Sequence, residues 1–240
     1  MDQYMKSSDW MKDRRQPIVT GLIIAAVLLV GFFGIRAFMN YRSNQASQAL
    51  AEGFCWENAV VSDPLPPPRP GTCVCKTDDE KHHKAFEAFE KAAATNGDTA
   101  RFYAAMNQLY FDAPKAEATL KAIADGSSVV SGQARLALAE RARTTGKFNE
   151  ALAEYQKLKN KPGDVAPLLI ELGIAETNEA MGKTKEAADL YFNIAKDASK
   201  TSIGTRALTQ LTRLDPARVE QLPAENKQGT TPRGSISLGQ

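Results

Sequence analysis

The sequence predicts an all-α protein in which a single N-terminal transmembrane helix is followed by an α-solenoid of helix pairs and a capping helix. Three observations support this prediction: an uncharged apolar run near the N-terminus, a motif that returns 36 residues later, and an alanine-rich composition with few β-branched runs beyond residue 35. Alanine has the highest intrinsic helix propensity. The 30 basic and 28 acidic residues nearly cancel, so we expect no nucleic acid among the partners.

The apolar run extends from Ile18 to Ile35 and contains no charged residue. At ~1.5 Å per residue it would span about 27 Å, close to the ~30 Å hydrocarbon core of a bilayer. Further apolar residues follow Arg36, whose long side chain can snorkel, so we predict a transmembrane helix over residues 18–39. A buried helix and a cleaved signal peptide are the alternatives. The nearest A-x-A, at residues 49–51, lies more than ten residues beyond Ile35, which favours an uncleaved anchor.

Basic residues predict the orientation of this span. Four lie before it and two follow it closely: Lys6, Lys12, Arg14 and Arg15 against Arg36 and Arg42. Positive charge is retained on the cytoplasmic side, so residues 1–17 are expected to form a cytoplasmic tail. The expected localisation is the cell inner membrane, with one span and a periplasmic C-terminal domain in a compartment where disulfides persist.

A repeat of 35 or 36 residues runs through the second half of the chain. GKFNEALAEY, Gly146–Tyr155, returns as GKTKEAADLY, Gly182–Tyr191, and APKAEATL, Ala113–Leu120, fits one period earlier. The same spacing relates four sets of small or large apolar residues: Ala104, Ala139 and Ala175; Ala116, Ala151 and Ala187; Leu120, Tyr155 and Tyr191; Ile123, Leu158 and Ile194. Small residues suit close helix crossings, and helix pairs of this size bury their faces by stacking.

These residues resemble the tetratricopeptide-repeat family, in which a helix, a Gly turn and a second helix with A-x-x-x-[aromatic] recur about every 34 residues. The resemblance implies a tetratricopeptide-like repeat domain over residues 78–214. It is incomplete, because Ala100, Arg135 and Glu171 occupy places where the family has a large aromatic residue. An unrelated helical bundle with chance periodicity is the alternative.

An insertion interrupts the first helix pair. Ala85, Phe89 and Ala92 form the pattern of a second helix, so its partner is expected to be a membrane-exit helix over residues 40–60. Residues 61–77 then replace a short turn. They include DPLPPPRPG, whose five prolines favour extended polyproline II structure.

The C-terminal end is expected to be simpler. Residues 203–214 predict a single capping helix, which Pro216 stops. Residues 215–240 are expected to be a flexible tail, because the end of the chain is polar and has no periodic apolar face.

All three cysteines lie at or near the ends of the insertion: Cys55 precedes it, and Cys73 and Cys75 lie in its last five residues. In an oxidising compartment a disulfide from Cys55 to Cys73 or Cys75 would staple its base, with ~3 kcal/mol of stabilisation in the chain-entropy model. We favour Cys75, which is closer in sequence to the following helix. A zinc site of Cys55, Cys73, Cys75 and His82 is the rival hypothesis, although C-x-C departs from the usual C-x₂₋₄-C spacing.

Sequence motifs of catalysis are not found. The chain has no G-x-S-x-G, phosphate loop, G-x-G-x-x-G or H-E-x-x-H, so we expect neither enzymatic activity nor a cofactor. In a solenoid of helix pairs the first helices line the concave, binding face. Polar residues expected there form the candidate binding groove: Arg101, Gln108, Gln133, Glu140, Arg143, Glu176 and Glu179.

The combined architecture also resembles a narrower group, the ancillary SecYEG translocon subunit family (YfgM type). The features that carry this resemblance are the basic cytoplasmic tail, one span, a helix leaving the membrane and about three helix pairs. It implies protein partners: the secretion translocon, a membrane-anchored periplasmic chaperone and exported chains. The proline and cysteine insertion and the polar C-terminal tail depart from the family pattern. A structural adaptor for envelope assembly and a metal or redox protein are the alternative functions.

Overall fold

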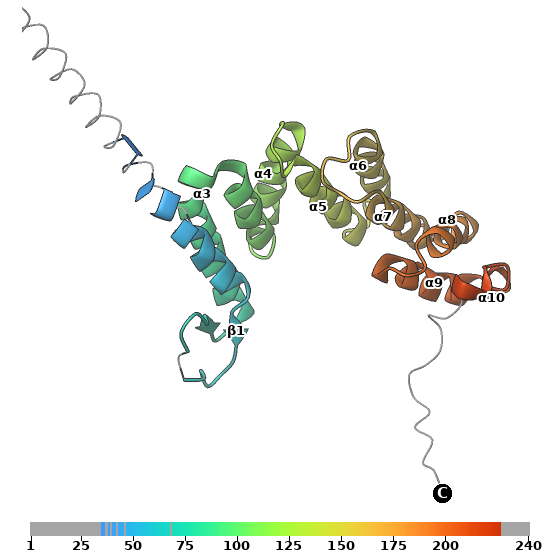
Figure 1. Cartoon of the computed structure of the whole chain (residues 1–240), viewed down its shortest axis with the longest axis horizontal. Coiled ribbons are helices and arrows are strands. Elements are labelled where there is room, and N and C mark those ends of the chain that lie inside the picture. Colours follow the sequence, from blue (N-terminus) through green and yellow to red (C-terminus); the bar gives the residue numbers. More distant parts are fainter. Residues whose placement is uncertain are drawn as a thin grey trace, which may run out of the picture.

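The computed structural model describes residues 35–226 except 37, 39, 42, 46 and 68, and over that range the chain is an extended array of helices (Figure 1). Residues 47–57 are helical and precede a two-stranded sheet, β1 (Val60–Val61) and β2 (Val74–Cys75). The helices that follow are α3 (Asp78–Gln108), α4 (Ala113–Asp125), α5 (Ser131–Thr144), α6 (Phe148–Asn160), α7 (Pro167–Ala180), α8 (Thr184–Asp197), α9 (Ser202–Leu214) and α10 (Pro216–Val219).

Helix α3 contains two helices of the repeat, joined at Gly97. The backbone there has φ 55° and ψ −135°, which is not helical and is accessible to glycine. The first half of α3 pairs with residues 47–57, and the second half begins the next pair with α4. Two further pairs, α5 with α6 and α7 with α8, and then α9 complete the array.

The residues related by the repeat are the core of the array. All twelve recurring positions identified in the sequence are buried, and Tyr155 and Tyr191 are wholly inaccessible. The core is divided into clusters between successive pairs rather than gathered at one centre. The turns inside two of the pairs contain Gly146 and Gly182, at φ 78° and 75°, as the repeated glycine predicted. This arrangement is the predicted solenoid.

The membrane predictions fall on residues that are almost all outside the described part. No helix among the described residues is long and apolar enough to cross a membrane. The predicted tail over residues 1–17 and residues 18–34 of the predicted span lie outside the described part.

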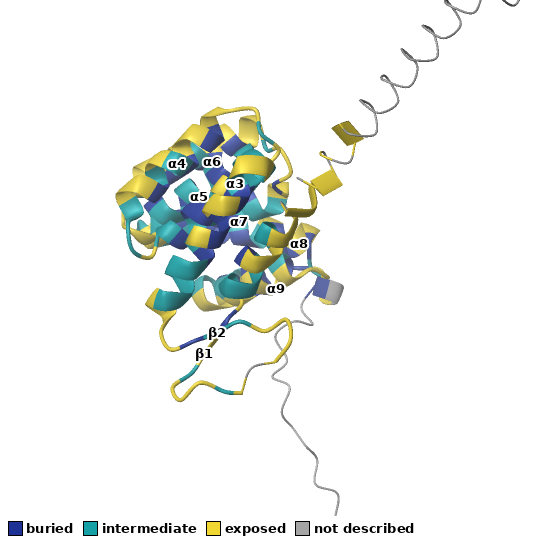
Figure 2. Cartoon of the chain, turned by 90° about the vertical axis from the view of Figure 1, so that its left-hand side faces the viewer, coloured by how far each residue is buried: buried dark blue, intermediate teal, exposed yellow. Residues whose placement is uncertain are grey.

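The insertion contains structure that the sequence did not predict. The helix expected over 40–60 ends at Glu57, and β1 pairs in parallel with β2, with Val60 opposite Val74. The backbone N–H of Val60 and that of Ser62 donate to Cys73 O and Cys75 O, both at 3.0 Å. The loop between the strands extends away from the helices and is mostly exposed (Figure 2).

The cysteine pairing differs from the favoured one. Cys55 bonds to Cys73, with Cα atoms 5.5 Å apart, while Cys75 is a free, buried thiol. The parallel register explains the difference. Cys73 lies one residue before the strand pair, next to the end of the helix that carries Cys55, whereas Cys75 lies further along, opposite Val61.

The zinc hypothesis is also wrong for the described residues, among which no group of three or more His, Cys, Asp or Glu side chains is placed to hold a metal. Two of the four proposed ligands are bonded to each other. The fourth, His82, shares a hydrogen bond with Asn107 Oδ1 at 2.9 Å.

The C-terminal end is more ordered than the prediction of a flexible tail from residue 215. Val219 and Leu222 are buried against the core of α7, α8 and α9. Asn226 is also buried, and its side-chain amide donates to Lys196 O at 2.7 Å. Residues 227–240 lie outside the described part.

Candidate binding groove on the first helices of the repeats

An apolar groove lies between the second half of α3 and helix α5. Its volume is about 680 Å³. The α3 side supplies Phe102 and Met106, and Leu109 and Tyr110 follow directly after that helix. The α5 side supplies Gln133, Leu136, Ala137, Glu140, Arg141 and Thr144. Both walls are first helices of their repeats, the surface on which solenoids bind their partners.

Helical spacing puts these residues on one face of each wall. Phe102, Met106 and Leu109 follow one another at i, i+4 and i+7, so they form an apolar stripe along α3. The adjacent Ala104 and Ala105 are buried in the core. The three side chains of the stripe pack against the core cluster around Ala105 and Leu120 and are only partly covered, so the stripe is the open edge of that core.

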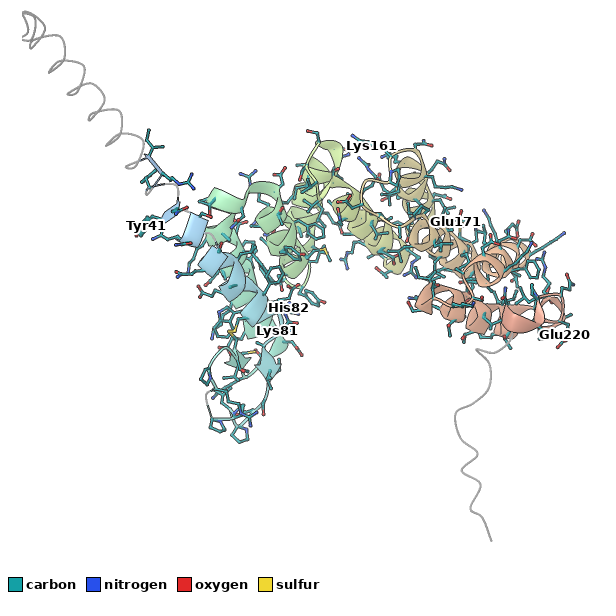
Figure 3. All side chains as sticks on the ribbon, viewed as in Figure 1. Tyr41, Lys81, His82, Lys161, Glu171 and Glu220 are labelled. Carbon is teal, nitrogen blue, oxygen red and sulfur yellow. A yellow bond between two sulfur atoms is a disulfide. The ribbon has the colours of Figure 1, made fainter. Side chains whose placement is uncertain are left out.

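Tyr110 forms the rim of the groove and is 72% exposed. The ring of His82 stacks on it, with centroids 3.5 Å apart and planes 8° apart. His82, labelled in Figure 3, lies in the first half of α3 and is held in turn by the buried Asn107. The preceding helix thus positions an aromatic ring that is open to solvent.

Gln133 lines the groove and carries an unpaired acceptor beneath its surface. Its Oε1 is buried and accepts no hydrogen bond from any described residue. A buried acceptor without a donor destabilises a protein by ~1–3 kcal/mol. The wall of the groove at Gln133 is therefore not optimised for stability.

A chain of ion pairs continues from the groove along the first helices. Arg143 forms ion pairs with Glu140 of the groove and with Glu176 of α7. The distance from Arg143 Nη2 to Glu176 Oε2 is 3.4 Å. Arg206 of α9 lies 2.6 Å from Glu176 Oε1. That oxygen still lacks a hydrogen bond of good geometry, and we regard the contact as electrostatic. Two inward tyrosines join the chain, since Tyr155 donates to Glu140 at 2.5 Å and Tyr191 to Glu179 at 2.8 Å.

Burial governs the proton affinities in this network. It raises the pKa of Glu176, and the neighbouring Arg206 and Arg143 only partly offset it. Burial and the hydrogen bond to Glu140 raise the pKa of Tyr155 far above its ordinary value. Burial alone would lower the pKa of Arg143, but its hydrogen bond with Glu140 and the charge of Glu176 raise it. Arg143 is therefore a fixed positive charge beside the groove.

The structure brings together part of the groove predicted from the sequence. Gln133 and Glu140 line it, and Arg143 and Glu176 extend from Glu140 through ion pairs. Three residues lie apart.

Arg101 is exposed and pairs with Asp98, and Gln108 ends α3 without lining the groove. Glu179 is bound to Tyr191 and to Arg213 of α9.

Sequence reasoning missed the apolar walls, because it selected only polar residues on the first helices. The stripe of Phe102, Met106 and Leu109 was the available signal. Large apolar residues at this spacing on a first helix, beside alanines that fill the helix crossing, indicate an apolar face wider than the crossing itself covers.

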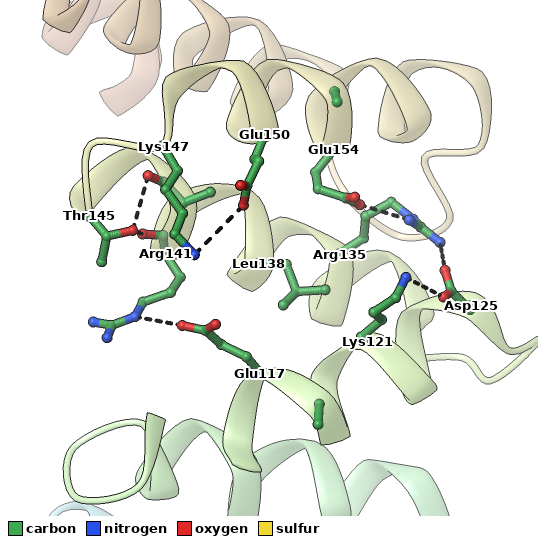
Figure 4. Close-up of a pocket in the computed structure, with 13 residues that line it drawn as sticks. Glu117, Lys121, Asp125, Arg135, Leu138, Arg141, Thr145, Lys147, Glu150 and Glu154 are labelled. Atoms are coloured by element: carbon green, nitrogen blue, oxygen red, sulfur yellow. Dashed lines mark hydrogen bonds and ion pairs between the residues drawn. The ribbon is translucent and has the colours of Figure 1, made fainter. Parts of the chain in front are cut away.

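A second hollow of about 390 Å³ lies over α4, α5 and α6 (Figure 4). Its charges satisfy one another: Arg135 pairs with Asp125 and Glu154, Arg141 with Glu117, and Lys147 with Glu150. Leu138 lies between these pairs (Figure 4). A ligand would have to break them, so the apolar groove is the better candidate site.

Stacked helix pairs with an open groove on the first helices define the class of protein: a solenoid that works as a protein-interaction module. The tetratricopeptide repeat-like domain family matches residues 8–211, and the chain belongs to that family. No curated protein and no solved structure matches the chain.

Proposed function

We propose that the protein is a membrane-tethered interaction module on the extracytoplasmic face of the inner membrane. In this proposal it assists the secretion translocon and a membrane-anchored periplasmic chaperone with exported chains. The apolar groove between α3 and α5 carries the proposal, because exported chains expose apolar side chains before they fold.

The chemistry of the groove fits a segment of unfolded chain. Phe102, Met106 and Leu136 offer flexible and aromatic apolar contacts, which adapt to varied side chains. Arg141 and Glu140 bound the apolar surface with both signs of charge. Such a site recognises apolar segments without requiring one sequence.

Two further observations support the extracytoplasmic location. The apolar run with an excess of basic residues before it predicts an inward N-terminus. The Cys55–Cys73 disulfide fits an oxidising compartment, since cytosolic thiols are kept reduced.

Site-specific photo-crosslinking in membranes tests the proposal. A photoreactive residue at Met106 or Leu136 is expected to capture translocon subunits, the chaperone or exported chains, identified by mass spectrometry. The matched control is Lys159, an exposed residue on α6, a second helix. Equal capture from Lys159 would argue against the groove. Capture of cell-wall assembly proteins alone would replace the translocon role with that of an envelope adaptor.

A further inference from the structure

The loop between β1 and β2 is an exposed segment that the groove does not use. It contains Pro64-Leu65-Pro66-Pro67, with Arg69 two residues further on. Pro64, Leu65, Pro67 and Arg69 are all exposed, and Leu65 is 45% accessible although it is apolar. The loop extends beyond the helix array near the start of α3 (Figure 1).

The base of this loop is fixed although its tip is free. The parallel pairing of β1 with β2 holds both ends, and the Cys55–Cys73 disulfide ties the second end to the preceding helix. Ala59, directly before β1, and Cys75 of β2 are buried. Figure 3 shows the disulfide beside the part of α3 where Lys81 and His82 are labelled. The tip is therefore presented on a rigid base.

The backbone of the tip is available to a partner. Proline has no N–H and its φ is fixed near −65°, so successive prolines favour polyproline II. Residues 65–67 belong to no helix or strand. Ser62 donates its hydroxyl to Pro64 O at 3.0 Å, and Thr72 N donates to Arg69 O at 3.1 Å. The carbonyl oxygens of residues 65–67 accept no hydrogen bond from the described residues.

The side chains have the spacing that polyproline recognition needs. Polyproline II has three residues per turn, so in that conformation Pro64 and Pro67 share one edge with Leu65 beside it. Arg69 then begins the turn that contains Pro70 and Gly71. Domains that bind P-x-x-P segments place such prolines between aromatic rings. The side chain of Arg69 makes no ion pair or hydrogen bond within the described chain, so its charge is free to pair with a carboxylate of a partner.

We propose that residues 63–71 form a docking ligand for a polyproline-recognising protein domain. The aromatic groove of that domain takes Pro64, Leu65 and Pro67, and an acidic pocket next to it takes Arg69. The disulfide and the strand pair hold the two ends of the segment in place before binding, which reduces the ordering entropy that binding costs. This ligand is separate from the groove on α3 and α5 and does not depend on the function proposed for it.

A protein partner fits the loop better than an anionic membrane surface does. Within residues 63–71 the charges are one acidic residue, Asp63, and one basic residue, Arg69. Attachment to anionic lipid takes a cluster of four to eight basic residues, as a general rule. The loop instead combines proline, one apolar side chain and one cation.

Titration of the purified full-length chain into an isolated SH3 domain tests this chemistry. The probe is a domain with an aromatic groove and an acidic specificity pocket, and its matched control has the pocket carboxylates changed to amides. We expect saturable binding of the native chain to the domain with the acidic pocket. The affinity should fall at least tenfold for the Arg69→Ala or Pro67→Ala chain, and also for the native chain with the amide control domain. The substitution Arg101→Ala, at an exposed arginine on α3, should leave the affinity unchanged.

Circular dichroism of each variant separates loss of the ligand from loss of the fold. Absence of saturable binding by the native chain would overturn the proposal, as would equal affinity of the Arg69→Ala and native chains. A Met106→Ala variant distinguishes the two sites, because it should weaken crosslinking at the groove and leave SH3 binding intact.

Discussion

Gly173 lies directly beneath the ring of Tyr155. A Cβ at Gly173 would stand 2.4 Å from Cζ and Oη of that ring, which is wholly buried and has no space to move. Gly173→Ala is expected to lower the free energy of unfolding by ~1–2 kcal/mol, because overpacking a core outweighs the ~1 kcal/mol that alanine adds as a helix former.

Urea unfolding followed by circular dichroism measures the effect of Gly173→Ala. Glu171→Ala, two residues earlier in α7, is the control for a change of helix propensity alone. An unfolding midpoint for Gly173→Ala at or above that of the native chain would show that the close contact does not constrain this position.

Glu176 makes stability depend on pH in a definite direction. Burial raises its pKa above the ordinary value of 4.5. A carboxyl group with a raised pKa binds its proton more tightly in the folded chain. Its contribution to stability is therefore complete below pH 4.5 and is lost as the pH rises through the folded-state pKa.

Glu176→Gln keeps this position neutral at every pH. The free energy of unfolding of the variant, minus that of the native chain, should become more positive between pH 4 and pH 7. Urea melts at several pH values measure it, and Glu186→Gln provides an amide at an exposed site of α8 for comparison. A difference that becomes more negative with rising pH would mean that Arg143 and Arg206 outweigh burial.

Individual residues show what the sequence could predict and what it could not. The recurring alanines and tyrosines were predicted because burial at one position of a repeat imposes the same size on each copy. The disulfide partner of Cys55 was not predicted correctly, because the choice between Cys73 and Cys75 depends on a strand register. Strands of two residues leave no periodic pattern that would reveal it.

Helices α3 to α9 could be predicted because each has its own apolar period and its own turn. The two pieces of α3 were expected as separate helices, and the bend at Gly97 separates them without a loop. Two residues of the predicted binding groove, Gln133 and Glu140, line the groove between α3 and α5, but its apolar walls were not predicted. The open edge of the core that forms these walls becomes visible only when the neighbouring helices are placed.

The segment after α9 acts as the cap of the solenoid. Its buried residues Val219 and Leu222 cover the last core cluster, and Arg218 pairs with Asp189 of α8. Ending the chain after Leu214 is expected to lower the free energy of unfolding by ~3 kcal/mol or more, since each buried apolar side chain contributes ~1.5–3 kcal/mol.

A chain that ends after Asn226 is the matched control for this truncation. It keeps the hydrogen bond from Asn226 to Lys196 O and should unfold at the same urea concentration as the full chain. If the two truncations have equal stability, residues 215–226 are not part of the fold.

The whole molecule has its core in separate clusters along the helix array. Each pair contacts chiefly its neighbours, so a change at one interface acts on the adjacent pairs and little beyond them. The groove at α3 and α5 and the loop at the start of α3 lie toward the N-terminal end, whereas the cap lies at the other end (Figure 1). Variants of the cap therefore leave both proposed binding surfaces intact.

The predicted orientation of the chain in a membrane would determine which partners reach these surfaces. Four basic residues precede the predicted span over residues 18–39, and only two basic residues lie between Ile35 and Arg69. This charge difference predicts an inward N-terminus and an outward repeat domain. Alkaline phosphatase fused after Gln240 is expected to be active, and the same enzyme fused before Met1 inactive, because it folds only in an oxidising compartment. Changing Lys6, Lys12, Arg14 and Arg15 to Gln removes the charge bias and should reduce the activity of the C-terminal fusion. Activity from the N-terminal fusion alone would reverse the topology and place the loop and the groove in the cytoplasm.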